Sequence, residues 1–149
     1  MKRIAELRDL SDDHHTALVL ARRCRQWAKR DDPNELAGAW RQVREAFAAH
    51  LAPHFEIEER HLLPGLEAIG EPGLAGRIRA DHAALRALVE APAASRDAVE
   101  RFGRLLESHV RFEEREAFEV AQARLPAPAL RAVAEACRSI PRACPTFLA

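Results

Sequence analysis

The stretch His-Phe-Glu-Ile-Glu-Glu-Arg at residues 54–60 places an imidazole, His54, four residues before a carboxylate, Glu58. Side chains four residues apart lie on the same face of an α-helix, so this pair can bind one metal ion. The pattern recurs as His-Val-Arg-Phe-Glu-Glu-Arg at residues 109–115, with apolar residues again at its second and fourth positions. The two copies predict a helical protein that binds metal.

The composition favours a single all-α domain. The chain has 149 residues, enough to bury a core without disulfides, and 48% of them are hydrophobic, with Ala dominant and Tyr absent. Chains rich in Ala and poor in β-branched residues favour helices over strands. We therefore expect one domain over residues 1–149, with its core at roughly residues 5–122 and a C-terminal tail at residues 125–149.

The charge does not indicate nucleic acid or an acidic membrane as a partner. Lys plus Arg and Asp plus Glu both total 23, so the formal net charge is zero. The first ten residues interrupt their apolar positions with charges, which is typical of neither a signal peptide nor a membrane span. We expect a cytoplasmic protein whose cysteines remain thiols. We interpret Cys24 as a small core residue and place Cys137 and Cys144 in the tail.

Apolar residues recur at helical spacing in four segments joined by short connections. The spacing predicts helices at about residues 3–29, 33–69 and 74–89, and a fourth helix that begins after Ser95 and includes Val120. Asp32 and Ser95 are the expected N-caps of the second and fourth helices.

This pattern favours an antiparallel up-down four-helix bundle with a short C-terminal helix among the prolines of the tail. Pro53 precedes His54 inside the second predicted helix. It removes one backbone hydrogen bond, and we expect a kink there.

Each predicted helix carries one histidine on its apolar face; these are His14, His54, His82 and His109. A single histidine in such a position is usually a hydrogen-bonded core residue. Two carboxylates, Glu58 and Glu113, share the apolar faces, and buried carboxylates are unfavourable unless they are paired or bind metal. A metal centre would satisfy all six side chains at once.

The choice between His14 and its neighbour His15 follows from periodicity. Residues at helical spacing from His14 are apolar, whereas several at the same spacing from His15 are polar. The dipeptide Asp-His at residues 13–14 also recurs at residues 81–82, so the two halves of the chain resemble each other.

This ordered set of motifs resembles the hemerythrin-like, or HHE cation-binding, family. The resemblance covers roughly residues 5–122, through Leu-Ser-Asp-Asp-His ending at His14, His-x-x-x-Glu-Glu from His54, Asp-His-x-x-Leu around His82, and His-x-x-x-Glu-Glu from His109. It implies a four-helix bundle that holds two non-haem irons, bridged by carboxylates and an oxygen species. By position, it implies terminal ligands at His14, His54, His82 and His109 and bridging ligands at Glu58 and Glu113.

The sequence departs from the oxygen-carrying members of that family. Those carriers have a second histidine one turn after the first on the third helix, where this chain has Arg86. They also place an acid five residues after the last histidine, which would make Glu114 a ligand in place of Glu113. His50 and His61 lie one turn either side of the first His-x-x-x-Glu pair, and either could supply the missing nitrogen or support the site.

The incomplete ligand set favours a sensor or an iron or redox buffer over a dedicated oxygen carrier. Our leading hypothesis is a diiron protein that binds oxygen or a related small ligand and that has no organic substrate. The first alternative is an enzyme acting on peroxide or nitric oxide, because Glu58 and His61 form one copy of the Glu-x-x-His element of ferritin-like sites. The second alternative is a bundle with one structural metal ion or none.

The remaining charged and aromatic residues have structural interpretations. We expect an exposed face of i,i+4 charge pairs from Glu56, Glu59, Arg60, Arg111, Glu114 and Arg115. We expect Trp27 and Trp40 to pack near the ends of the bundle, and Phe47, Phe55, Phe102 and Phe112 to separate the metal pocket from water.

Overall fold

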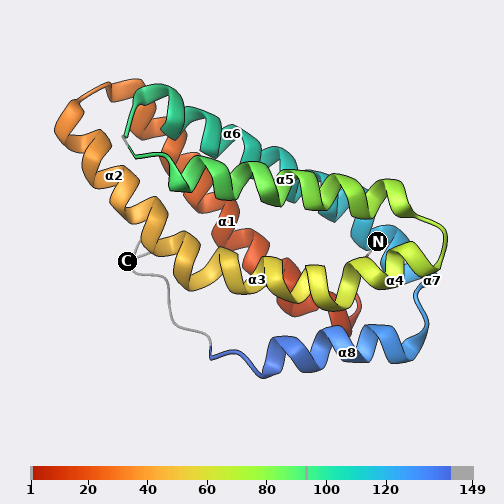
Figure 1. Ribbon diagram of the computed structural model, residues 1–149. Coiled ribbons are helices and arrows are strands. Elements are labelled where there is room, and N and C mark those ends of the chain that lie inside the picture. Colours follow the sequence, from red (N-terminus) through yellow and green to blue (C-terminus); the bar gives the residue numbers. More distant parts are fainter. Residues whose placement is uncertain (1, 93, 142–149) are drawn as a thin grey trace.

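The computed structural model describes residues 2–92 and 94–141, and helices make up all of the regular structure in these ranges. Long helical runs lie side by side along the molecule, and a shorter helix covers one side near the C-terminus (Figure 1). The all-α prediction is therefore confirmed. None of the helices in the described ranges is both long and apolar enough to cross a membrane.

The chain forms four helical runs followed by the short helix. The first run is α1 (Ala5–Arg30), and the third is α5 (Pro72–Glu90). The second run consists of α2 (Pro33–Ala46), η1 (Phe47–Leu51), α3 (Ala52–Ile57), η2 (Glu58–Leu62) and α4 (Leu63–Ala68). The fourth consists of α6 (Arg96–Phe112), η3 (Glu113–Ala117) and α7 (Phe118–Arg124), and the short helix is α8 (Ala127–Arg138).

Side-chain caps begin the second and fourth runs at the predicted residues. Oδ1 of Asp32 accepts hydrogen bonds from the backbone N–H groups of Asn34 at 2.8 Å and Glu35 at 3.2 Å. Oγ of Ser95 accepts one from the backbone N–H of Ala98 at 3.0 Å. Each cap satisfies a donor that has no partner inside the helix, so these two starting points are fixed by local sequence.

The segments η1, η2 and η3 are π-helical turns, which are wider than α-helical ones and are frequent at functional sites. The turns η2 and η3 begin at Glu58 and Glu113, the carboxylates of the two motif copies. The sequence predicted a kink at Pro53. Just before this residue the structure has the turn η1, after which the N–H of Ala52 bonds to the carbonyl of Phe47, five residues back.

The buried apolar residues form two clusters, and the four motif histidines lie between them. One cluster contains Ala17 and Leu85, and the other contains Leu10 and Ile78. His14 therefore separates Leu10 from Ala17 along α1, and the histidine of α5 separates Ile78 from Leu85 in the same way. A polar layer thus divides the core into two parts.

Cys24 belongs to the first cluster and is fully buried, which confirms its interpretation as a core residue. Burial raises the pKa of its thiol to about 12, so this cysteine remains protonated. Cys137 is a buried residue of α8 in the second cluster, and Cys144 lies outside the described residues. α8 itself packs against α1, α3 and η2.

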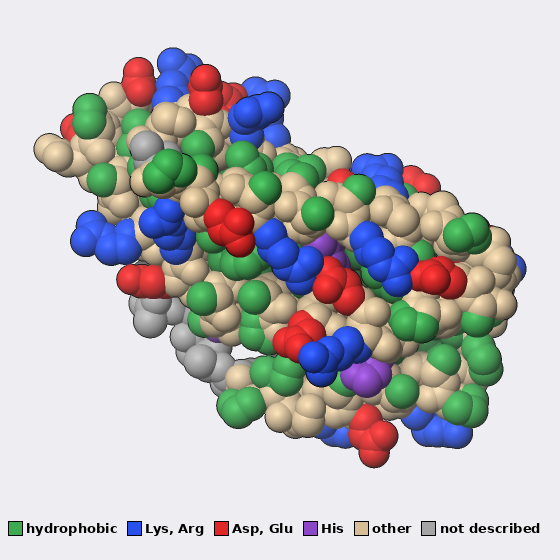
Figure 2. Space-filling model, viewed as in Figure 1, with side chains coloured by type: hydrophobic (Ala, Val, Ile, Leu, Met, Phe, Trp, Pro, Cys, Tyr) green, Lys and Arg blue, Asp and Glu red, His purple; other side chains and the backbone are tan. Residues whose placement is uncertain are grey.

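Charged side chains of both signs are interspersed over the face of the molecule shown in Figure 2. Several of them form ion pairs one helical turn apart, such as Glu56–Arg60 and Glu107–Arg111. This distribution agrees with the zero net charge of the chain.

The helices α1 and α6 approach each other closely at Gly103. A Cβ atom added at Gly103 would lie 2.8 Å from Cβ of Cys24 and 2.9 Å from the carbonyl oxygen of Ala21. Neither atom belongs to the flexible end of a side chain, so the helices themselves would have to move apart.

We therefore predict that Gly103→Ala lowers the free energy of unfolding by about 1–3 kcal/mol. The matched control is Gly76→Ala on the exposed face of α5, where an added Cβ meets nothing within 4 Å. This control should raise the free energy of unfolding by about 0.5–1 kcal/mol, because alanine favours helix. Urea unfolding followed by circular dichroism measures both, and equal stabilities of the two variants would contradict the close approach.

Candidate metal centre

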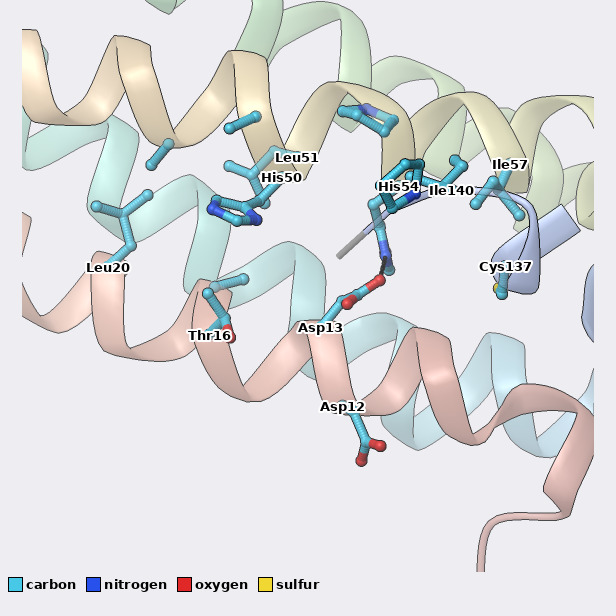
Figure 3. A pocket seen from close by; sticks show the side chains of 15 residues that line it. Asp12, Asp13, Thr16, Leu20, His50, Leu51, His54, Ile57, Cys137 and Ile140 are labelled. Atoms are coloured by element: carbon cyan, nitrogen blue, oxygen red, sulfur yellow. Dashed lines mark hydrogen bonds and ion pairs between the residues drawn. The ribbon is translucent and has the colours of Figure 1, made fainter. Parts of the chain in front are cut away.

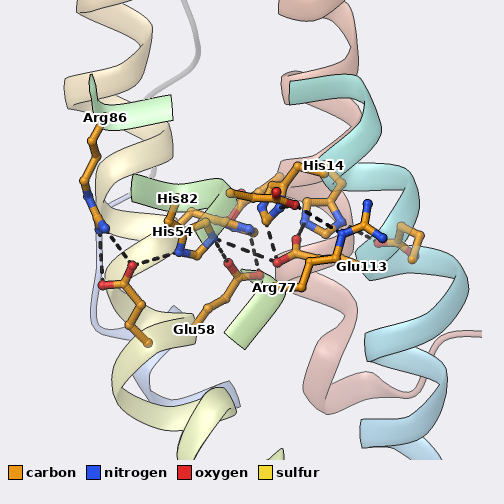
Figure 4. A network of polar contacts seen from close by, with 12 residues as sticks. His14, His54, Glu58, Arg77, His82, Arg86 and Glu113 are labelled. Carbon is orange, nitrogen blue, oxygen red and sulfur yellow. Dashed lines mark hydrogen bonds and ion pairs between the residues drawn. The ribbon is translucent and has the colours of Figure 1, made fainter. Parts of the chain in front are cut away.

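Six buried polar side chains converge where the four helical runs meet (Figure 4). No more than 3% of any of these residues is exposed. They are His14 of α1, His54 of α3, Glu58 of η2, His82 of α5, His109 of α6 and Glu113 of η3. The structure thus brings together all six residues that the sequence selected.

The outer nitrogen of each histidine, Nδ1, makes a hydrogen bond with a carboxylate from another helical run. The pairs are His14–Glu114 at 2.6 Å, His54–Asp13 at 3.0 Å, His82–Glu59 at 2.8 Å and His109–Asp81 at 3.3 Å. An ionised carboxylate can only accept, so Nδ1 carries the proton in each pair. The inner nitrogen, Nε2, then presents a lone pair to the centre, as in histidines that bind metal.

The inner atoms of the centre have no hydrogen-bond partners. They are Nε2 of the four histidines and both carboxylate oxygens of Glu58 and Glu113, and all eight are buried. An unpaired buried polar atom costs about 1–3 kcal/mol, so eight of them in one place are unfavourable unless a cation binds between them. These atoms therefore fit a metal ion, whose ligands must present lone pairs.

The donor atoms form two groups that share both carboxylates. One group contains His14 and His54, the other contains His82 and His109, and each also includes Glu58 and Glu113. Within a group, the ligand atoms lie within 4.8 Å of one another. Two metal ions could therefore bind side by side, each between two imidazoles and two carboxylates.

Each shared carboxylate directs one oxygen to each group. Oε1 of Glu58 lies 3.1 Å from Nε2 of His54, and its Oε2 lies 3.2 Å from Nε2 of His82. Oε2 of Glu113 lies 2.9 Å from Nε2 of His14, and its Oε1 lies 3.3 Å from Nε2 of His109. This is the arrangement that a carboxylate needs to bridge two ions.

The electrostatic field at the centre favours positive charge. Burial alone would lower the pKa of His54, but the charge of Glu58 and the hydrogen bond with Asp13 raise it well above its ordinary value. Burial alone would raise the pKa of Glu58, but His54 and His82 hold it well below its usual range. Protons and metal ions therefore compete for the same lone pairs.

Glu59 and Glu114 are a correction to the sequence analysis, which placed them on an exposed face. Both are half-buried and accept hydrogen bonds from ligand-forming histidines. Burial favours the neutral form of Glu114, but hydrogen bonds with His14, Ser11 and Arg3 lower its pKa to about 2. Both carboxylates therefore support the centre.

The other candidates that the sequence left open lie outside the two donor groups. His15 is exposed, and His50 and His61 are half-buried. Arg86, at the position of the carriers' additional histidine, donates to both oxygens of Glu59 at 2.7 and 3.2 Å.

Aromatic rings cover two sides of the centre. Phe55 stacks on His82 with 3.8 Å between ring centroids, as expected for a residue that excludes water. Phe118 stacks on His14 at 5.0 Å, and the sequence analysis missed it because it follows the second motif instead of lying within it. Phe102, predicted to line the pocket, has its ring contact with Trp40 in the first apolar cluster.

The family model of Hemerythrin, described as "Hemerythrin HHE cation binding domain", matches residues 5–121. The matched region contains all six donor residues and ends before α8. No curated protein and no solved structure matches the chain.

We predict that Asp81→Ala weakens metal binding by about 10–100-fold, because Nδ1 of His109 loses the acceptor that fixes its proton and its ring orientation. The matched control is Glu56→Ala, which removes an exposed carboxylate from α3. Isothermal titration of the metal-free proteins with a divalent metal ion measures the two affinities. An affinity of Asp81→Ala equal to that of the control would show that this hydrogen bond does not support a ligand.

Proposed function

Because the chain belongs to the hemerythrin HHE cation-binding domain family, we propose that its buried centre holds two non-haem iron ions and binds oxygen or a related small ligand. The observation that supports two ions is the sharing of Glu58 and Glu113 by both donor groups. We also propose the antiparallel up-down order of the four runs that the sequence favoured.

In this proposal, the four motif histidines are terminal ligands and the two buried glutamates are bridges. Imidazole and carboxylate ligands without thiolate suit iron, and two histidines with carboxylate leave open positions in iron proteins that react with oxygen. Each donor group offers two nitrogens and two oxygens. A small exogenous ligand would therefore find room beside the protein ligands, and bound iron would supply the redox change that oxygen uptake requires.

The chain's own residues hold the protons away from the ligand atoms. Asp13, Glu59, Asp81 and Glu114 each accept from one Nδ1, so the four Nε2 lone pairs stay directed inward. Phe55 and Phe118 cover the imidazoles of His82 and His14 and exclude water from them. Arg86 stands where the oxygen carriers have a further histidine, and this shorter ligand set favours a sensor or an iron or redox buffer.

Metal analysis tests the proposal directly. Protein purified without oxygen should contain two iron ions per chain, one for each donor group. Exposure to air should then produce a visible oxo-to-iron charge-transfer band and stoichiometric oxygen uptake. One zinc ion per chain without a visible band would contradict the proposal and support a structural metal, and catalytic loss of added peroxide would support an enzyme instead.

Substitutions distinguish the shared ligands from the unshared ones. His54→Ala removes a ligand from one donor group, so we expect about half of the wild-type iron content. Glu58→Ala removes a ligand from both groups, so we expect both ions to be lost. The control His61→Ala changes a half-buried histidine of the same run outside both groups, and it should retain the wild-type content.

Iron per chain, measured by elemental mass spectrometry, gives the result, and circular dichroism confirms that each variant is folded. If His54→Ala and Glu58→Ala lose the same amount of iron, the proposal that His54 belongs to one ion site and Glu58 to both is contradicted. Wild-type content in either variant would remove that residue from the site.

A further inference from the structure

A cavity of about 250 Å³ lies beside the metal centre, between α1, the second helical run and the end of α8 (Figure 3). His54 forms part of its wall, and so does Asp13, which reaches across from α1 to accept the hydrogen bond of Nδ1 of His54. The cavity thus contacts the centre through one of the proposed ligands and its supporting carboxylate.

Other sides of the centre are closed by aromatic rings. Phe118 stacks on His14, and Phe55 stacks on His82 and meets His109 edge-on with 5.6 Å between centroids. Phe55 also meets His54 edge-on with 6.1 Å between centroids, so the stacked rings cover one face each of His14 and His82. Beyond His54, by contrast, there is space for a small molecule.

Part of the cavity wall comes from residues beyond the region that matches the family model. Cys137 of α8 and the following Ile140 and Pro141 line it, and all three lie beyond the matched residues 5–121. The six donor residues all lie within the matched region, so α8 is not needed to supply a ligand. It instead encloses a space next to one.

The lining indicates which molecules the cavity would accept. Ten of its 15 lining residues are apolar: Ala17, Leu20, Ala46, Ala49, Leu51, Pro53, Ile57, Cys137, Ile140 and Pro141. Largely apolar cavities bind apolar guests such as xenon. Asp12 and Asp13 also line it, and the exposed Asp12 directs its carboxylate away from the cavity (Figure 3). The negative charge of both residues opposes the approach of anions. Its volume is below that of sites for drug-sized ligands, so the guest must be small.

We propose that this cavity binds neutral, oxygen-sized molecules and is the route by which they reach the metal centre past His54, while Asp12 and Asp13 slow the entry of small anions. The claim that these molecules reach a metal ion rests on the proposed function, but their binding within the cavity requires no metal. The two parts of the proposal can therefore be tested separately.

The first experiment uses xenon and the metal-free protein. Xenon-129 NMR should detect a bound site in the wild type, and Ala49→Trp, which places a large side chain at the cavity wall, should abolish it. Thr16→Phe, from the α1 side, repeats the test if Ala49→Trp does not fold. The control Ala37→Trp lies at an exposed position of α2 away from the cavity and should retain xenon binding. Absence of xenon binding in the wild type would overturn the proposal.

The second experiment follows ligand association with the iron-loaded protein by stopped-flow absorption. Ala49→Trp should slow association of nitric oxide, a neutral ligand, by about tenfold, which corresponds to about 1.4 kcal/mol in the barrier. Its iron content should equal that of Ala37→Trp. An unchanged nitric oxide rate in a variant that has lost xenon binding would overturn the route.

The carboxylates are tested with azide, a small anion. Asp12→Asn should speed azide association roughly two- to threefold at low ionic strength and leave nitric oxide unaffected, because only the anion is repelled. Asp97→Asn, at the exposed start of α6, is the charge-matched control and should change neither rate. Equal azide rates in the two variants would overturn the slowing of anion entry. If the protein binds xenon but takes up no iron when iron is supplied without oxygen, the proposed function is contradicted while the cavity is still supported as a binding site.

Discussion

Glu58 and Glu113 are completely buried, and none of their four carboxylate oxygens has a hydrogen-bond partner. Removing an ionised carboxylate from water is unfavourable unless positive charge lies beside it, and His54 and His82 hold the pKa of Glu58 low, so Glu58 stays ionised. A neutral imidazole with its proton on Nδ1 presents only a lone pair to these oxygens, so the compensating positive charge must come from a proton on Nε2 or from a metal ion. A metal ion would satisfy both kinds of atom at once, because the imidazole nitrogens and the carboxylate oxygens can all donate lone pairs to it.

The hydrogen bonds of the outer carboxylates connect the four helical runs in a closed ring. α1 supports the second run through Asp13–His54, the second supports α5 through Glu59–His82, α5 supports the fourth through Asp81–His109, and the fourth supports α1 through Glu114–His14. Each imidazole is thus positioned by two runs at once, which fixes its orientation before an ion binds. The ring also explains the repeated dipeptides. In each Asp-His the histidine belongs to the centre and the aspartate supports a histidine of another run. In each Glu-Glu the first glutamate belongs to the centre and the second supports a histidine of another run.

Periodicity predicted the helices and all six inner residues, because the 3.6-residue repeat identifies which face of a helix is buried. It failed at Glu59 and Glu114 for the same reason. The next residue along an α-helix points about 100° away from the buried face, so an acid at that position reads as exposed. These carboxylates reach histidines on other runs, and His82 lies 23 residues from Glu59 and His14 lies 100 residues from Glu114. Such pairings depend on how the helices pack, which no local pattern contains.

The π-helical turns were likewise not predicted from local sequence. Two of them, η2 and η3, begin at the glutamate of a motif copy, although the sequence around Glu113 contains no proline to indicate an irregular helix. Phe118 follows the second of these turns directly, and its ring stacks on His14. The sequence analysis assumed an unbroken α-helix through this region and assigned the aromatic cover to residues before the turn. Phe102 was expected to shield the metal pocket, but its ring contacts Trp40. Phe118, which does cover a histidine, was not predicted.

The two donor groups are equivalent in composition, since each has two imidazoles and the same two carboxylates. Arg86 maintains this equivalence: its guanidinium is paired with Glu59, and it takes the position at which the resemblance to oxygen carriers would place a further histidine. The donor count therefore gives a small ligand no preference between the two ions. The two donor groups differ in access from outside, because an aromatic ring covers His82 whereas a cavity adjoins His54. If our proposal is correct, α8 and the residues after it, and not the ligand set, determine on which side of the centre a small molecule arrives.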